Sequence, residues 1–122
     1  MKAYRGVNET VIEDYLMTRI EVLGGICIKG NPQNNRGMPD RICIMSQGLV
    51  IFVECKRPGR KPRANQKYYL KKLQARGHHA LYISTHSGVD ALYNWIVNYQ
   101  KKFKTIKRSH ECKEPFCSTR WV

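Results

Sequence analysis

The stretch GMPDRICIMSQGLVIFVECK, residues 37–56, decides the fold. It contains two runs of apolar and β-branched residues separated by a short turn, which is the pattern of a β-hairpin. A hairpin brings its two ends together, so Asp40 and Glu54, fourteen positions apart, are expected to meet at one end of a sheet. Gly37, just before the hairpin, would let the backbone approach a ligand closely.

The end of this hairpin carries the residue types of a metal site. Side chains alternate sides along a strand, so Glu54 and Lys56 point the same way and Cys55 points oppositely. Hard divalent cations such as Mg²⁺ prefer carboxylate oxygens, backbone carbonyls and water, and Asp40, Glu54 and the carbonyl of Cys55 can supply them. Lys56 would contact a scissile phosphate or position the attacking water, as in a metal-dependent nuclease. Two structural alternatives stay open: a turn aspartate at Asp40, and a simple ion pair between Glu54 and Lys56.

A third acid is expected from the first helix. Glu9 and Glu13 are one turn apart and share a helix face. Glu13 stands beside Ile12 in the most apolar part of the helix, which points it nearer to the sheet. We therefore expect Glu13 to join the acidic site. The alternative for both residues is an ordinary helix acid that faces solvent, and for Glu9 this alternative is favoured.

The rest of the chain predicts an α/β domain with the element order α-β-β-β-α-β-α. The helix starts from Asn8 or Thr10 and ends near Leu23. The hairpin makes part of the sheet antiparallel, and the later strand-helix-strand crossover adds a parallel pair, so the central sheet is mixed and flanked by helices. The remaining expected elements are strands at 26–29, 41–45, 49–55 and 80–84 and helices at 65–76 and 87–101. Residues 1–101 form one domain, and residues 102–122 form a basic, cysteine-containing tail.

The charge of the chain indicates a polyanionic partner. The 122 residues carry 22 Lys and Arg against 9 Asp and Glu, a net charge of +13, and nucleic acid is the commonest polyanion. A protein of the membrane surface is the rival class, but no basic helix has a large apolar face. No signal peptide or apolar span is visible and the cysteines number five, so we expect a cytoplasmic chain with reduced thiols.

A basic segment directly follows the proposed acidic site. No acid occurs from residue 55 to residue 89, while nine cations lie between Lys56 and Arg76. Such a patch would hold the phosphates on either side of a cleaved bond; a solvated helix face is the alternative. The candidate DNA contacts are Lys29, Arg57, Arg60, Lys61, Arg63, Lys67 and Lys71. No base-reading motif appears, so we expect recognition of backbone and shape.

The cysteines do not make a convincing zinc site. His110, Cys112 and Cys117 cluster near the end of the chain, but a zinc site needs about four ligands at suitable spacing. Cys27 and Cys43, like Cys55, alternate with apolar strand residues and are interpreted as small core residues.

Several motifs, in order and at domain-sized spacing, resemble the PD-(D/E)xK nuclease superfamily and, within it, the VRR-NUC branch. The match covers roughly residues 8 to 100. The motifs are Ile12-Glu13-x-Tyr15-Leu16, Leu23-Gly24-Gly25-x-x-x-Lys29, Gly37-x-Pro39-Asp40, Glu54-Cys55-Lys56, Gln66-x-x-Tyr69 and Gly77.

The resemblance implies an αβββαβ core and hydrolysis of DNA that depends on Mg²⁺ or Mn²⁺. It implies Asp40 and Glu54 as metal ligands, Lys56 as the contact to phosphate or water, Glu13 as the completing acid, and Gln66 as support for Lys56 or the phosphate. Stand-alone members of this branch come from phages or bacteria, and cleavage of branched DNA such as Holliday junctions is the implied activity. The tail after about residue 102 has no match in this pattern.

A junction has two symmetric strands to cut, so we expect a C2 homodimer. Two other functions stay open: a nicking or restriction-type nuclease of the same superfamily, and a basic DNA-binding accessory protein whose acids are structural.

Overall fold

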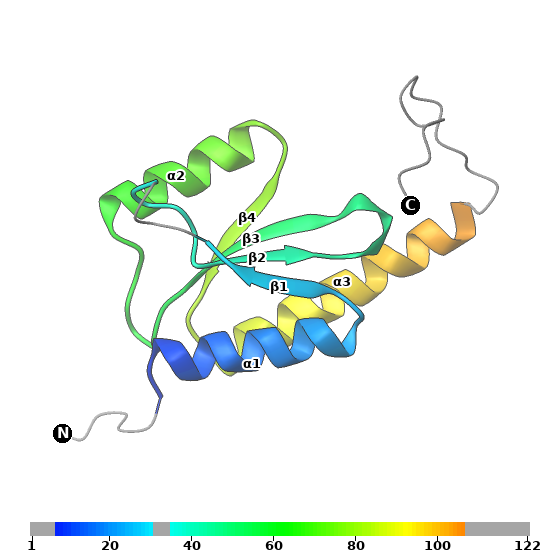
Figure 1. Cartoon of the computed structure of the whole chain (residues 1–122), viewed down its shortest axis with the longest axis horizontal. Helices are drawn as coiled ribbons and strands as arrows, with labels where there is room; N and C mark the ends of the chain where they lie inside the picture. The colour runs from blue at the N-terminus through cyan, green and yellow to red at the C-terminus, as the bar shows by residue number, and fades with distance from the viewer. Residues whose placement is uncertain (1–6, 31–34, 107–122) are drawn as a thin grey trace.

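The computed structural model describes residues 7–30 and 35–106, and they form a mixed α/β fold (Figure 1). The helices are α1 (Glu9–Val22), α2 (Ala64–Ala75) and α3 (His86–Ile106), and the strands are β1 (Ile26–Lys29), β2 (Arg41–Ile44), β3 (Val50–Cys55) and β4 (His79–Ile83). A 3-10 turn, η1 (Ser46–Gly48), joins β2 to β3. The predicted element order and fold class are confirmed.

The four strands form one sheet in the order β1-β2-β3-β4. β1 pairs with β2 and β2 with β3 in antiparallel fashion, whereas β3 and β4 are parallel. The hairpin turn is tight because Gln47 and Gly48 both have positive φ, 61° and 73°. α2 is the crossover between the two parallel strands, as predicted for a mixed sheet.

The hydrophobic core lies between one face of the sheet and helices α1 and α3. Figure 1 shows these two helices side by side on that face, while α2 lies on the opposite side next to β4. The core residues of α1 are spaced by four, so they form one stripe on the helix. The buried core residues are Ile12, Leu16 and Ile20 of α1, Cys43, Ile51, Val53, Cys55 and Ile83 of the strands, and Val89, Leu92 and Ile96 of α3, with Met45 and Leu49 at the hairpin turn.

The start of α1 and the end of α3 can be compared with the boundaries expected from the sequence. Asn8 caps α1, because its side-chain oxygen accepts a hydrogen bond of 3.0 Å from the backbone N–H of Val11. α3 continues to Ile106, five residues beyond its expected end at Lys101. The remainder of the expected tail, with His110, Cys112 and Cys117, lies outside the described residues.

Within the part of the chain that the structure describes, no helix is both long enough and apolar enough to cross a bilayer.

Candidate active site

The hairpin brings Asp40 and Glu54 to directly opposite positions. Arg41 pairs with Val53, so the next pair along the two strands is Asp40 and Glu54. The N–H of Met45 donates to the carbonyl of Leu49, which identifies that pair as hydrogen-bonded. Because the two kinds of pair alternate in an antiparallel ladder, positions 40 and 54 form a pair without mutual hydrogen bonds, where side chains lie closest. The predicted meeting of the two acids therefore follows from the strand register.

Two backbone contacts hold Asp40 in place. One carboxylate oxygen of Asp40, Oδ2, accepts a hydrogen bond of 3.0 Å from the backbone N–H of Cys55. On its other side, the carbonyl of Asp40 accepts a 2.8 Å hydrogen bond from the N–H of Gly30. A Cβ on Gly30 would collide with the carbonyl of Pro39, so only glycine allows this approach. The carboxylate is thus fixed across the end of β3.

Gly37 packs closely against α2. Its φ is +85°, and a Cβ there would lie 2.5 Å from the carbonyl oxygen of Asn65. The backbone at Gly37 therefore approaches the first turn of α2, and the expected approach to a ligand stays a prediction. This contact joins the loop before Asp40 to α2.

Glu54 and Lys56 are a buried, incompletely satisfied pair. Glu54 Oε2 lies 3.4 Å from Lys56 Nζ, and the two residues are only 1% and 7% exposed. The ion pair offered as a structural alternative is therefore present. However, the second carboxylate oxygen, Glu54 Oε1, is buried with no hydrogen-bond partner. A buried oxygen without a partner is costly, so the ion pair alone does not satisfy this carboxylate.

The carboxyl groups of the site hold their protons unusually strongly. Burial, followed by the nearby charge of Asp40, raises the pKa of Glu54 to about 7. Burial also raises the pKa of Asp40, against the opposing hydrogen bond from Cys55 and with a further increase from the charge of Glu9. Two adjacent carboxylates in a dry site repel each other. A bound cation would relieve that repulsion.

The residues at this position fit a hard divalent cation. Asp40 and Glu54 provide two carboxylates, one of which has an oxygen without a partner, and the backbone carbonyl of Cys55 is the third expected ligand. Among residues 7–30 and 35–106, no group of three or more His, Cys, Asp or Glu side chains is arranged to bind a metal. A site with two carboxylates and several retained waters is typical of Mg²⁺.

Glu13 lies on the other face of the sheet. Its Oε1 accepts a hydrogen bond of 3.1 Å from Arg41 Nε in a largely buried ion pair. Neighbouring strand residues point to opposite faces, so Arg41 faces α1 while Asp40 faces away from it. The structure therefore pairs Glu13 with Arg41, and the expected part of Glu13 in the acidic site stays a prediction.

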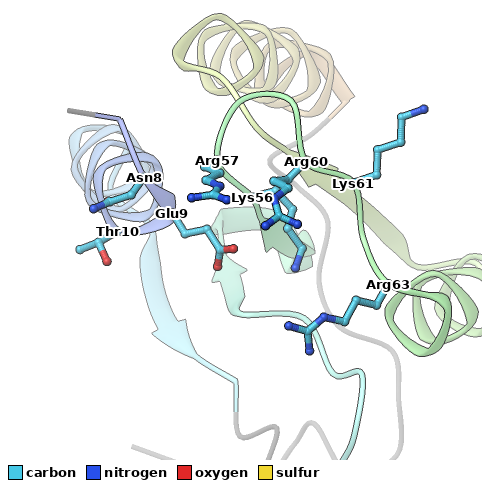
Figure 2. Close-up of a pocket in the computed structure, with 8 residues that line it drawn as sticks. All are labelled: Asn8, Glu9, Thr10, Lys56, Arg57, Arg60, Lys61 and Arg63. Carbon is cyan, nitrogen blue, oxygen red and sulfur yellow. The ribbon is translucent and has the colours of Figure 1, made fainter. Parts of the chain in front are cut away.

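Glu9 is the acid of α1 that reaches the site. It lines the same cavity as Lys56, and its charge contributes to the raised pKa of Asp40. Figure 2 shows its side chain projecting from the first turn of α1 toward the loop that carries Arg57 and Arg60. The pattern of apolar residues favoured Glu13, whereas the α1 charge that acts on the pKa of Asp40 is that of Glu9, in the first turn of the helix.

The side-chain oxygen of Gln66 is used to cap a helix. Gln66 Oε1 accepts a hydrogen bond of 2.8 Å from the backbone N–H of Arg63, at the start of α2. This contact closes the first turn of the helix. The contact of Gln66 seen here is with its own helix, and the expected support of Lys56 or of a phosphate stays a prediction.

A strongly cationic cavity of about 410 Å³ opens beside the two carboxylates. Lys56 connects the two features, because it lines this cavity and its ammonium contacts Glu54. The lining residues are Asn8, Glu9 and Thr10 from the start of α1 and Lys56, Arg57, Arg60, Lys61 and Arg63 from the segment between β3 and α2 (Figure 2). Four of the seven candidate DNA contacts therefore gather next to the acids.

The other three candidate DNA contacts lie outside the cavity lining. Lys67 and Lys71 are exposed on α2, and Lys29 is exposed at the end of β1. They extend the positive surface rather than the cavity.

Comparison with known proteins finds similarity to a phage protein and to a solved structure, although no family model matches the chain. The chain is 37% identical over 81 residues to "Putative nuclease p44" of Acyrthosiphon pisum secondary endosymbiont phage 1, an alignment that covers 66% of this chain and 87% of the phage protein. It also resembles a solved structure described as a VRR_NUC domain, with a TM-score of 0.66 and 29% identity over 70% of this chain and 94% of the other.

Proposed function

Because this chain belongs to the VRR-NUC family, we propose that it is a metal-dependent endonuclease that hydrolyses phosphodiester bonds in DNA. The observation that carries the proposal is the half-buried Asp40 beside the buried Glu54, which has one unpartnered oxygen, next to a cavity lined by five cations. Carboxylates hold the metal in such a site, and cations hold the phosphates.

Asp40, Glu54 and the carbonyl of Cys55 would hold Mg²⁺ or Mn²⁺, which when bound supplies an activated water and neutralises developing charge. Lys56 places its ammonium where the carboxylates meet the cavity, so it contacts the scissile phosphate or orients the attacking water. Glu9 completes the acidic side of the cavity in the role first expected of Glu13. Arg57, Arg60 and Arg63 bind the flanking phosphates.

We propose branched DNA, such as a four-way junction, as the preferred substrate. The cations that line the cavity are suited to phosphates, which carry no sequence information. The cations that line the cavity lie on the segment between β3 and α2 and not on a helix that could enter a DNA groove. We therefore propose that the protein selects its substrate by the shape and the sugar-phosphate backbone of the DNA.

A homodimer would place two such sites on the two symmetric strands of a junction. The face of β1 and β2 turned away from α1 and α3 offers a surface for this contact. Ile26, Ile28 and Ile44 are 58%, 42% and 38% exposed there, and their cross-strand pairing places them together on one face. Sedimentation of the chain with and without junction DNA tests the dimer; monomers in both conditions would exclude it.

The function is tested by comparing cleavage of a four-way junction and a linear duplex in Mg²⁺, in Mn²⁺ and in a chelator. We expect symmetric nicks in the junction with either metal and none with the chelator. Equal cleavage of the duplex would favour a nicking or restriction-type nuclease. Binding without any metal-dependent cleavage would favour the accessory DNA-binding protein instead.

A further inference from the structure

Cys27 and Cys43 face each other across the antiparallel pair β1–β2. The N–H of Gly30 donates to the carbonyl of Asp40, which identifies that pair as hydrogen-bonded. Counting back along the ladder, the cysteines occupy a pair without mutual hydrogen bonds, where the Cα atoms are about 4.5 Å apart. Disulfides span Cα distances from about 4.4 to 6.8 Å, so this register can accommodate a bond between the two sulfurs.

The two thiols differ in the way that suits an oxidation-sensitive pair. Cys27 is half-buried, whereas Cys43 is fully buried. A hydrogen bond from the Cys43 thiol, supported by the charge of Arg41, lowers the pKa of Cys27. The same contact and burial raise the pKa of Cys43. Sensor cysteines are accessible, have a low pKa and lie next to a second, resolving cysteine.

We propose that Cys27 and Cys43 form a redox site that a peroxide converts to a cross-strand disulfide. The sulfur of the Cys27 thiolate attacks one oxygen of hydrogen peroxide, the O–O bond breaks, and Cys27 becomes a sulfenic acid as hydroxide leaves. The sulfur of Cys43 then attacks the Cys27 sulfur, the S–O bond breaks, and water leaves with the Cys43 proton. In total, the two thiols lose two electrons and two protons, and the peroxide is reduced to two waters.

The third described cysteine does not share this arrangement. Cys55 is paired with Ile83 in the parallel part of the sheet, and burial raises the pKa of its thiol. It therefore provides a matched control within the same sheet.

The bond would close a loop that contains Asp40. Residues 28–42, between the two cysteines, include the connection from β1 to β2. A disulfide that closes a native loop restricts the unfolded chain more than the folded one. The oxidised protein should therefore unfold at a higher temperature than the reduced protein.

The test treats the folded full chain with hydrogen peroxide, blocks remaining thiols with an alkylating agent, and maps disulfides after trypsin digestion without reductant. We expect peptide 20–29 joined to peptide 42–56, and a Tm that rises on oxidation and returns with dithiothreitol. Peptide 42–56 contains both Cys43 and Cys55. Single-cysteine variants are therefore needed to show which of the two forms the cross-link.

Cys55→Ala should retain the cross-link, whereas Cys27→Ser and Cys43→Ala should each lose it. Cys27→Ser changes a half-exposed position and keeps a similar volume, so loss of the bond there is not explained by unfolding. The inference is overturned if the wild-type chain stays fully alkylated, if Cys27→Ser keeps the cross-link, or if oxidation leaves Tm unchanged or lower.

Discussion

Lys56 Nζ lies 3.4 Å from Glu54 Oε2 in the buried end of the sheet, and the other oxygen of Glu54 has no hydrogen-bond partner. The lysine therefore satisfies half of the carboxylate and leaves the other half for a ligand. Because Lys56 also lines the cationic cavity, this one contact connects the acidic group to the place where phosphates are expected to bind.

Replacing Lys56 with methionine should abolish most cleavage and change DNA affinity little. The change keeps most of the length of the side chain but removes the charge next to Glu54. We expect the cleavage rate to fall by about 10²-fold or more, as for other groups that stabilise developing charge. Single-turnover cleavage and a binding titration without metal separate the two effects. Lys61→Met is the matched control, because Lys61 points away from Lys56 in Figure 2; an equal loss of cleavage there would argue against a special role for Lys56.

Stability without metal should fall as pH rises through about 7. The pKa of Glu54 is about 7 in the folded chain against an ordinary 4.5, so the folded state binds a proton that the unfolded state has lost. This contribution is fully present below pH 4.5 and disappears above the folded pKa, and it amounts to about 3 kcal/mol. Urea unfolding in chelator from pH 5 to pH 8.5 measures it.

Glu54→Gln should flatten this pH dependence, because glutamine does not titrate. Added Mn²⁺ should bind the wild-type chain more tightly above pH 7 than below it, since the proton and the cation compete for the same oxygens. A wild-type stability that rises between pH 6 and pH 8, equally in the variant, would contradict the raised pKa.

Glu9 and Glu13 should respond differently to the same substitution. Glu9→Gln removes a charge from the cavity and should slow cleavage without loss of stability. Glu13→Gln removes the partner of Arg41, whose side chain is 10% exposed, and should lower the free energy of unfolding by about 1–3 kcal/mol while cleavage persists. Cleavage rates and urea unfolding of both variants decide the matter; the reverse pattern would restore Glu13 as the functional acid.

The cavity cations should dominate the salt dependence of DNA binding. Each lost phosphate contact lowers the slope of log affinity against log salt by about 0.9, so Arg57→Ala with Arg60→Ala should lower it by nearly 2. The pair Lys67→Ala with Lys71→Ala, on exposed α2, serves as a control of equal charge and should have a smaller effect. Equal effects of the two pairs would move the binding surface from the cavity to the helix.

Strand periodicity and hairpin geometry were sufficient to predict the meeting of Asp40 and Glu54 and the shared direction of Glu54 and Lys56. Both follow from alternation along neighbouring strands, which is a local property. The order of the elements was predictable for the same reason, since each apolar run and each turn has its own signal.

The partners of residues on different elements were not predictable in this way. Whether Glu9 or Glu13 approaches Asp40 depends on how α1 is placed along the sheet, and the stripe of Ile12, Leu16 and Ile20 fixes only which side of the helix is buried. The approach of Gly37 to Asn65 likewise joins segments that are distant in sequence. The hydrogen bond from the Arg63 N–H to Gln66 is local in sequence, so it could in principle have been predicted. It was not, because Arg63 is not one of the residues that usually begin a capped helix.

The most direct test of the proposed site is the rate of junction cleavage by Asp40→Asn in Mg²⁺ or Mn²⁺, compared with Asp14→Asn. Asp14 is an exposed acid on α1, so it controls for loss of one negative charge. We predict that Asp40→Asn lowers the rate by about 10²-fold or more while DNA binding persists, and that Asp14→Asn cleaves like the wild type. Cleavage by Asp40→Asn at the wild-type rate would contradict the assignment of the site.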